Sequence, residues 1–320
     1  MQGTANRKLN MQKLLAPAAL VILYVFFSIF GKNFFGYEGF KQILQSSYYI
    51  GFMAFGVTFV IITGGIDLSI GTVMMCSAII GGTAFTNWGW PVPLALVLVL
   101  ISGLFFGFCN GMMIAKAKLP PFIATLGTMM VSQGFGSIVS NVRTMHYSPT
   151  YVGDWFRPTF YISGNFPVGT IWLLGAFLIA TFLLNKTRLG RYNFAIGSNE
   201  EAARLSGINT EKWKMLVYMV SGLFSAFAGL IMSSRLGSAQ PQLGAGYESE
   251  AIAAAVIGGT SMSGGEGSII GTVIGAFIIS VLTNGLRSMA VSTEWQTVVT
   301  GLVLAGAVYF DLLRKRGKAA

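Results

Sequence analysis

The chain has 320 residues, of which 53% are hydrophobic and only 10% are charged. Soluble domains carry about 25% charged residues, so this composition excludes an ordinary water-soluble protein and predicts a membrane protein. The basic residues behind the net charge of +10 lie in loops beside apolar segments, where they set membrane topology. We therefore expect no nucleic-acid partner.

The N-terminal segment carries Arg7, Lys8 and Lys13 before the apolar run 14–30. No small-residue cleavage site follows this run, which favours an uncleaved first span over a signal peptide. About ten segments are apolar enough to cross a membrane as helices. They are 14–30, 43–63, 70–86, 92–115, 119–140, 168–185, 215–235, 248–262, 269–286 and 294–312. The third and eighth are short and glycine-rich, which predicts broken helices.

The distribution of basic residues predicts the orientation. An N-terminus and a C-terminus on the inside place most of the 21 Lys and Arg residues in inside segments, as the positive-inside rule requires. The outside loop 141–167 is long enough to carry some structure of its own. Cys76 and Cys109 both lie inside apolar runs, and we expect them to pack as small apolar side chains without a disulfide.

Glycines recur at four-residue spacing at Gly103, Gly107 and Gly111, and again at Gly271 and Gly275. On a helix, each set forms one bare face that lets another helix approach closely in lipid. We expect packing within the chain more than a seam between two copies.

Two segments resemble each other, 60–73 and 256–273, and each has a Gly-Gly pair, a serine and then Ile-Gly-Thr-Val. Transporters are often built from repeats with broken helices at corresponding places. Asp67 lies in the first break, where an ionisable residue is a candidate for function or else a cap for a helix that starts near Ser69. The same two interpretations apply to Glu248 and Glu250 before the eighth span.

The longest hydrophilic segment is the inside loop 186–214. Ser198 followed by Glu201 predicts a capping box, and Gly207 predicts a left-handed stop. The helix between them would have about two turns, with Ala202 and Ala203 giving a shallow side. A helix this short is not stable alone in water, so it must dock on a partner or on the protein's own spans.

The sequence Glu201-Ala-Ala-x-x-x-Gly207 resembles the cytoplasmic loop of ATP-binding-cassette (ABC) importer permeases. Further motifs resemble the permease subunits of ribose-type sugar importers, and the resemblance covers about residues 40–313. They are TGGIDLSIG (63–71), PFIATLG (121–127), TRLGRY (187–192), LSGIN (205–209), SAQP (238–241) and AIAAAVIGGT (251–260).

The resemblance implies a single permease domain over residues 1–320, an all-α polytopic bundle in the bacterial cytoplasmic (inner) membrane. Its coupling helix to a separate ATPase would comprise Ser198, Asn199, Glu200, Glu201, Ala202, Ala203, Arg204, Ser206 and Gly207. The implied partners are that ATPase, an extracytoplasmic sugar-binding protein, a second permease copy or close relative, and membrane lipid. The cargo would be a monosaccharide: a ribose-like pentose, a hexose or a related polyol. The chain has no P-loop motif, so ATP and Mg²⁺ would bind the partner and this chain would need no cofactor.

A neutral sugar needs a polar, uncharged path. The candidate lining residues are Thr63, Asp67, Ser69, Asn110, Thr283 and Asn284, although polar residues between spans also serve as interhelical hydrogen bonds. The main alternative is a ten-span secondary transporter driven by an ion or proton gradient, but such coupling normally uses several buried ionisable groups. A membrane enzyme is disfavoured because the one histidine, His146, lies in an outer loop and no metal cluster or activated nucleophile is evident.

Overall fold

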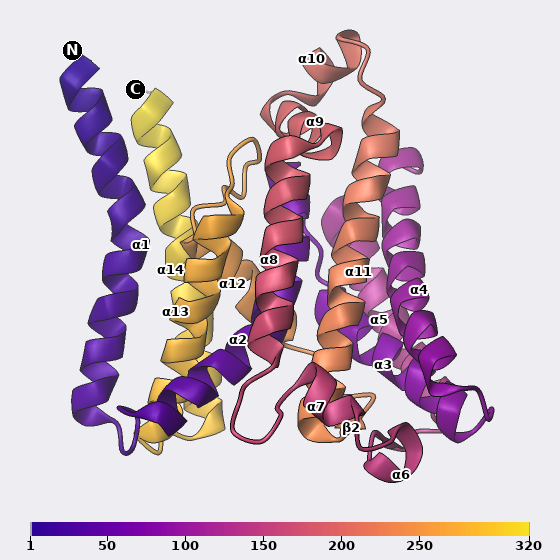
Figure 1. The fold of residues 1–320 in the computed structure, drawn as a ribbon. Coiled ribbons are helices and arrows are strands. Elements are labelled where there is room, and N and C mark those ends of the chain that lie inside the picture. Colours follow the sequence, from indigo (N-terminus) through magenta and orange to yellow (C-terminus); the bar gives the residue numbers. More distant parts are fainter. Residues whose placement is uncertain (1, 320) are drawn as a thin grey trace.

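The computed structural model describes the backbone of residues 2–319 and the side chains of residues 16–313. It is an all-α bundle (Figure 1). The long helices are α1 (Gln2–Phe30), α2 (Tyr37–Ile62), α3 (Ile70–Thr86), α4 (Val92–Gly111), α5 (Pro121–Val139), α8 (Gly169–Lys186), α11 (Thr210–Leu236), α13 (Ile269–Ser288) and α14 (Thr293–Ala319). The shorter elements are the π-helical turn η1 (Met112–Lys116), α6 (Pro149–Val152), α7 (Phe156–Phe160), α9 (Arg188–Ser198), α10 (Glu200–Leu205), α12 (Tyr247–Ile257), β1 (Met145–His146) and β2 (Ser238–Ala239).

Within the described residues, seven helices are long and apolar enough to cross a membrane. The apolar part of α1, Ala16–Phe30, and α3 are shorter. The predicted eighth span, 248–262, is wrong at its C-terminal end, because α12 stops at Ile257 where Gly258 and the left-handed Gly259 (φ +93°) follow. Its 11 residues span about 16 Å, roughly half of a hydrocarbon core. Short helices are therefore confirmed, but ten full-length spans are not.

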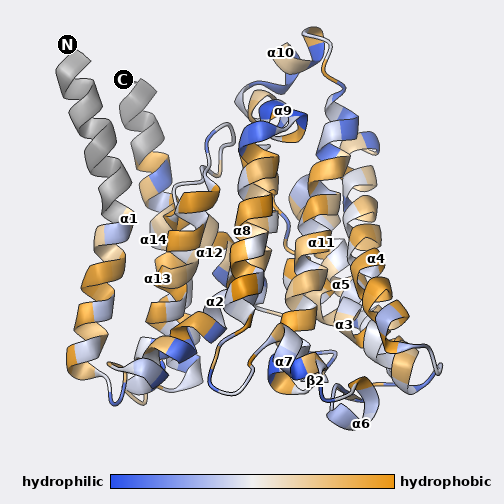
Figure 2. Cartoon of the chain, viewed as in Figure 1, coloured by the Kyte–Doolittle hydropathy of each residue, from blue (hydrophilic) through white to orange (hydrophobic). Residues whose placement is uncertain are grey.

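The two ends of the bundle differ. The start of α1, the end of α14, and both α9 and α10 lie at one end, whereas α6, α7 and β2 lie at the other (Figure 1). Hydrophobic colour runs along the long helices, and hydrophilic residues gather around α9 and α10 at one end and around α7 at the other (Figure 2). Because the basic loop 186–214 belongs to the first end, we call it the inner end and the opposite one the outer end. The start of α1 and the end of α14 thus lie at the same end of the bundle, as an even number of membrane crossings requires.

The central helix is α2, whose most apolar stretch is entirely buried inside the bundle. Helices α11 and α13 both pack closely against α2, while α4 packs against α11 and α12 packs against α13. The predicted glycine faces make the α4–α11 and α12–α13 contacts tight, since a methyl group at Gly103 would collide with the carbonyl oxygen of Gly222, and one at Gly275 with that of Ala254. The prediction that both glycine faces pack against helices of the same chain is therefore confirmed.

Residues 141–167 carry structure at the outer end, as expected. β1 pairs antiparallel with β2, with His146 opposite Ser238. Trp172 Nε1 donates a hydrogen bond of 2.6 Å to the Thr159 carbonyl, and its ring stacks on Phe160 of α7. Cys76 and Cys109 are both free thiols.

Candidate functional site

Helix α10 forms the predicted short helix of the inner loop, but one predicted cap is wrong. The N-cap is Asn199, whose Oδ1 accepts the amide of Ala202 at 2.9 Å. Ser198 is the last residue of α9, so it lacks the extended backbone that a cap needs, whereas Asn199 has it (φ −162°, ψ 103°). Glu201 consequently pairs with Arg204 at 3.0 Å instead of completing a capping box.

The predicted stop at Gly207 is confirmed by its left-handed backbone (φ +83°). The amide of Gly207 donates to the Arg204 carbonyl, and the amide of Ile208 donates to the Ala203 carbonyl, at 3.0 and 3.1 Å. This pair of hydrogen bonds is a Schellman motif. It fixes the end of α10 and the turn back towards α11.

Helix α10 lies at the tip of the inner end (Figure 1), and most of it is exposed to solvent. Of its six residues only Ala203 is buried, and the Lys214 Nζ–Glu200 Oε2 ion pair of 2.6 Å ties the helix to α11. Leu205, which the predicted set does not include, is 80% exposed. The sequence signal that could have identified Leu205 is that it is a single leucine within a polar segment. We call the exposed residues of this loop the coupling surface, after the role that the sequence predicts for it: Glu201, Ala202, Arg204, Leu205 and Ser206.

Beneath α10, the end of α9 contacts both helix breaks of the predicted repeat. A methyl group at Gly197 would collide with the carbonyl oxygen of Ile62 and lie 2.6 Å from the amide of Gly265. Gly265 itself donates a hydrogen bond of 2.9 Å to that Ile62 carbonyl. We call Gly64, Gly197, Gly264 and Gly265 the glycine junction. It was not predicted, because no local pattern shows that three distant loops meet.

The predicted repeat corresponds to two similar breaks that lie together. Residues 63–69 separate α2 from α3, and residues 258–268 separate α12 from α13. Close by, Thr58 and Thr272 share a hydrogen bond of 2.8 Å between their hydroxyls. A displacement of α9 would therefore reach both helix pairs.

Three of the predicted path residues form one buried cluster. Asp67 Oδ1 accepts the amide and the hydroxyl of Ser69 at 3.0 and 2.6 Å, while Asn110 Nδ2 donates to Ser69 Oγ at 2.9 Å. Asp67 Oδ2 accepts from Ser221 of α11 at 2.8 Å. The cluster joins the residues before α3 to α4 and α11, which is a structural role for Asp67, whereas the N-cap position of α3 is Ser69.

The other predicted path residues lie outside this cluster. Thr63 Oγ1 donates to the Val60 carbonyl at 2.6 Å, and Thr283 Oγ1 donates to the Ile279 carbonyl at 3.0 Å. Asn284 Nδ2 donates to Ser46 Oγ at 2.9 Å and joins α13 to α2. All six side chains thus make hydrogen bonds within the chain, and their place on a path stays a prediction.

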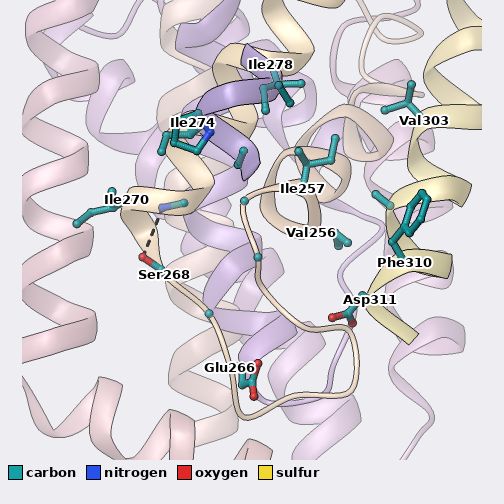
Figure 3. Close-up of a pocket in the computed structure, with 18 of the residues that line it drawn as sticks. Val256, Ile257, Glu266, Ser268, Ile270, Ile274, Ile278, Val303, Phe310 and Asp311 are labelled. Carbon is teal, nitrogen blue, oxygen red and sulfur yellow. Dashed lines mark hydrogen bonds between the residues drawn. The ribbon is translucent and has the colours of Figure 1, made fainter. Parts of the chain in front are cut away.

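A cavity of about 1070 Å³ lies between α1, α13 and α14 (Figure 3). Ile270, Ile274, Ile278, Val303 and Phe310 give it mostly apolar walls (Figure 3). Asp311 lies at its edge and accepts hydrogen bonds from Ser261 Oγ and the Met262 amide at 2.9 and 3.1 Å. None of the six predicted path residues lines this cavity. Within the part of the chain that the structure describes, no group of three or more His, Cys, Asp or Glu side chains could hold a metal ion.

Residues 39–308 match the family described as "Branched-chain amino acid transport system / permease component". The chain is 43% identical over 302 residues to the ribose import permease protein RbsC of Bacillus subtilis (strain 168), covering 94% of this chain and 93% of that one. RbsC of Escherichia coli (strain K12) is 41% identical over 297 residues, covering 92% and 91%. The xylose transport system permease protein XylH of the same strain is 36% identical over an alignment of 374 residues, covering 97% and 94%. No solved structure matches the chain significantly. The chain therefore belongs to this family of transport-system permease components.

Proposed function

We propose that the chain is the membrane-spanning permease subunit of an ABC importer that moves a monosaccharide into the cytoplasm. The exposed coupling surface on α10 carries this proposal, because it offers a fixed docking point at the inner end of an apolar bundle. The relatives named for ribose and xylose import support a pentose or a related sugar as cargo. They also favour this function over a gradient-driven transporter and over an enzyme.

The coupling surface would receive a separate ATPase that binds ATP and Mg²⁺. Leu205 provides an apolar contact at its centre, and Glu201 and Arg204 provide charged contacts around it. A force on α10 passes through the Glu200–Lys214 ion pair to α11 and through α9 to the glycine junction. From there it reaches α2 and α3 on one side and α12 and α13 on the other, which gives alternating access a physical route.

The remaining partners follow from the two ends and the outer faces. A sugar-binding protein would dock at the outer end, where β1, β2, α6 and α7 supply ordered structure. Lipid of the bacterial cytoplasmic membrane would cover the exposed apolar faces, such as Leu302 and Phe310 of α14, which are 69% and 70% exposed. A second copy would complete the path. During transport, the polar candidates Thr63, Asp67, Ser69, Asn110, Thr283 and Asn284 would exchange some interhelical hydrogen bonds for sugar hydroxyls.

The decisive experiment is uptake of radiolabelled ribose and xylose into proteoliposomes that contain the complex with its ATPase and binding protein. We expect uptake to require ATP on the inner side and to continue when a protonophore dissipates the proton gradient. Uptake that ignores ATP and stops with the protonophore would establish the secondary-transporter alternative.

A further inference from the structure

The segment between β2 and α12 is irregular at the depth of the membrane interior. α12 and α13 run antiparallel, with Ala254 against Gly275 and Gly258 against Gly271. This register places residues 247–250 opposite residues 279–282, about halfway along α13 (Ile269–Ser288). Residues 240–246 thus connect the outer end to the middle of the bundle without a helix.

A second contact also places this segment inside the bundle. Gly244 lies against the carbonyl of Gly71 in the first turn of α3, about 22 Å along that helix from its outer end. Non-helical backbone at such depth is tolerated only where protein covers it or where it lines a water-filled path. Gln240, Gln242, Ala245 and Gly246 are exposed, which favours the water-filled path.

Two acidic residues follow this segment, and their hydrogen bonding differs. Both carboxylate oxygens of Glu248 accept the amide of Gly246, at 3.1 and 3.0 Å. Oε2 of Glu250 is buried and has no hydrogen-bond partner. A buried carboxylate oxygen without a donor costs free energy, and a donor from a ligand would recover it.

Aromatic and basic side chains surround Glu250. Tyr49 is a side-chain hydrogen-bond partner of its carboxylate, and the charges of Arg287 and Arg235 lie close enough to attract it. The Tyr49 and Tyr247 rings are 5.1 Å apart between centroids at 64°, and the Arg235 guanidinium lies 5.8 Å from the Tyr49 ring centre. The two arginines offset the acidic charge, so the group suits a neutral ligand.

We propose that Gln242, Tyr247 and Glu250, with the exposed backbone of 240–246, form a monosaccharide site on the outer half of the path, which we call the Tyr–Glu site. A sugar hydroxyl would donate to Glu250 Oε2, the glutamine amide would pair with other hydroxyls, and the Tyr247 ring would pack on the C–H face of the sugar. The ends of broken helices in transporters commonly hold cargo. The site rests on the proposed function for the identity of its ligand.

The test uses the whole complex in proteoliposomes with ribose and xylose as probes. Glu250→Gln should lower the initial uptake rate at least tenfold while ATP hydrolysis stimulated by the loaded binding protein stays within twofold of wild type. The matched control is Glu38→Gln, which changes an exposed acid near the outer end that pairs with Lys41 and should transport normally. Uptake by Glu250→Gln within twofold of wild type would overturn the site.

Failure of the wild type to transport either probe would count against the proposed function alone. A second measurement tests the Tyr–Glu site in that case, and also if Glu250→Gln does not assemble. Gln242→Cys is placed in a chain whose two cysteines, Cys76 and Cys109, are changed to serine. We expect a membrane-impermeant maleimide added from the outer side to label it. Absence of labelling in the assembled complex would show that residues 240–246 do not line a water-filled path, and the Tyr–Glu site would be rejected.

Discussion

At the scale of single residues, Leu205 is the most telling side chain of the coupling surface. It is 80% exposed beside charged neighbours, and burying a leucine side chain contributes about 2 kcal/mol. We expect Leu205→Asp to weaken binding of the ATPase about 30-fold. Titration of the detergent-solubilised permease with its ATPase measures this change. Leu205→Met is the control and should bind as wild type; equal binding by Leu205→Asp would show that α10 docks through other residues.

Residue-level prediction from sequence was off by one position at the start of α10. Ser198 and Asn199 are both good caps, and the Ser198–Glu201 spacing favoured the serine. The backbone decides between them, because α9 continues through Ser198 and the first extended residue is Asn199. Gly207 was predictable since only its own backbone conformation is involved, whereas the contacts of Leu205 depend on what the rest of the loop leaves exposed.

At the scale of elements, the glycine junction is where the coupling loop meets the two helix breaks. Gly197→Ala adds a methyl group against the Ile62 carbonyl and the Gly265 amide, so α9 must move away from both breaks. We expect the variant to insert and to hydrolyse ATP, but to lose at least tenfold in uptake. The stability cost of such overpacking is about 1–3 kcal/mol.

The measurement is the number of sugar molecules imported per ATP hydrolysed, in the same proteoliposomes. Gly175→Ala on α8 is the matched control, because a methyl group there has no neighbour within 4 Å and should leave the ratio unchanged. A normal ratio in Gly197→Ala would mean that force reaches the helices by another route, such as the Glu200–Lys214 ion pair.

Most helices were predictable from the sequence because each is a long apolar run between loops. The end of α12 was not, since the apolar run continues past Ile257 while Gly258 and Gly259 turn the backbone. The repeat predicted two similar breaks, but not that they meet. That contact needs the Gly265–Ile62 hydrogen bond between segments about 200 residues apart, and no local periodicity encodes it.

At the scale of the whole molecule, helix faces without a partner point to an assembly larger than one chain. On α5, Phe122, Met130 and Ile138 are exposed, and methyl groups at Gly127 and Gly134 would meet no atom within 4 Å. These two glycines are seven residues apart and therefore lie on the same face of the helix. A bare strip of this kind lets a second helix approach closely in lipid, which fits the proposed second copy.

We expect α5 to meet α5 of a second copy, so a cysteine at position 134 should cross-link two chains. Gly134→Cys, in a chain with Cys76 and Cys109 changed to serine, should give a disulfide-linked dimer under mild oxidation in native membranes. Gly175→Cys on α8 is the control, because its surroundings are equally open but no second glycine lies seven residues away on the same helix. Equal cross-linking at both positions would indicate random collision, and cross-linking at position 175 alone would place the seam on α8. A dimer joined through α5 would leave α10 of each copy free at the inner end, so one ATPase could seat on each.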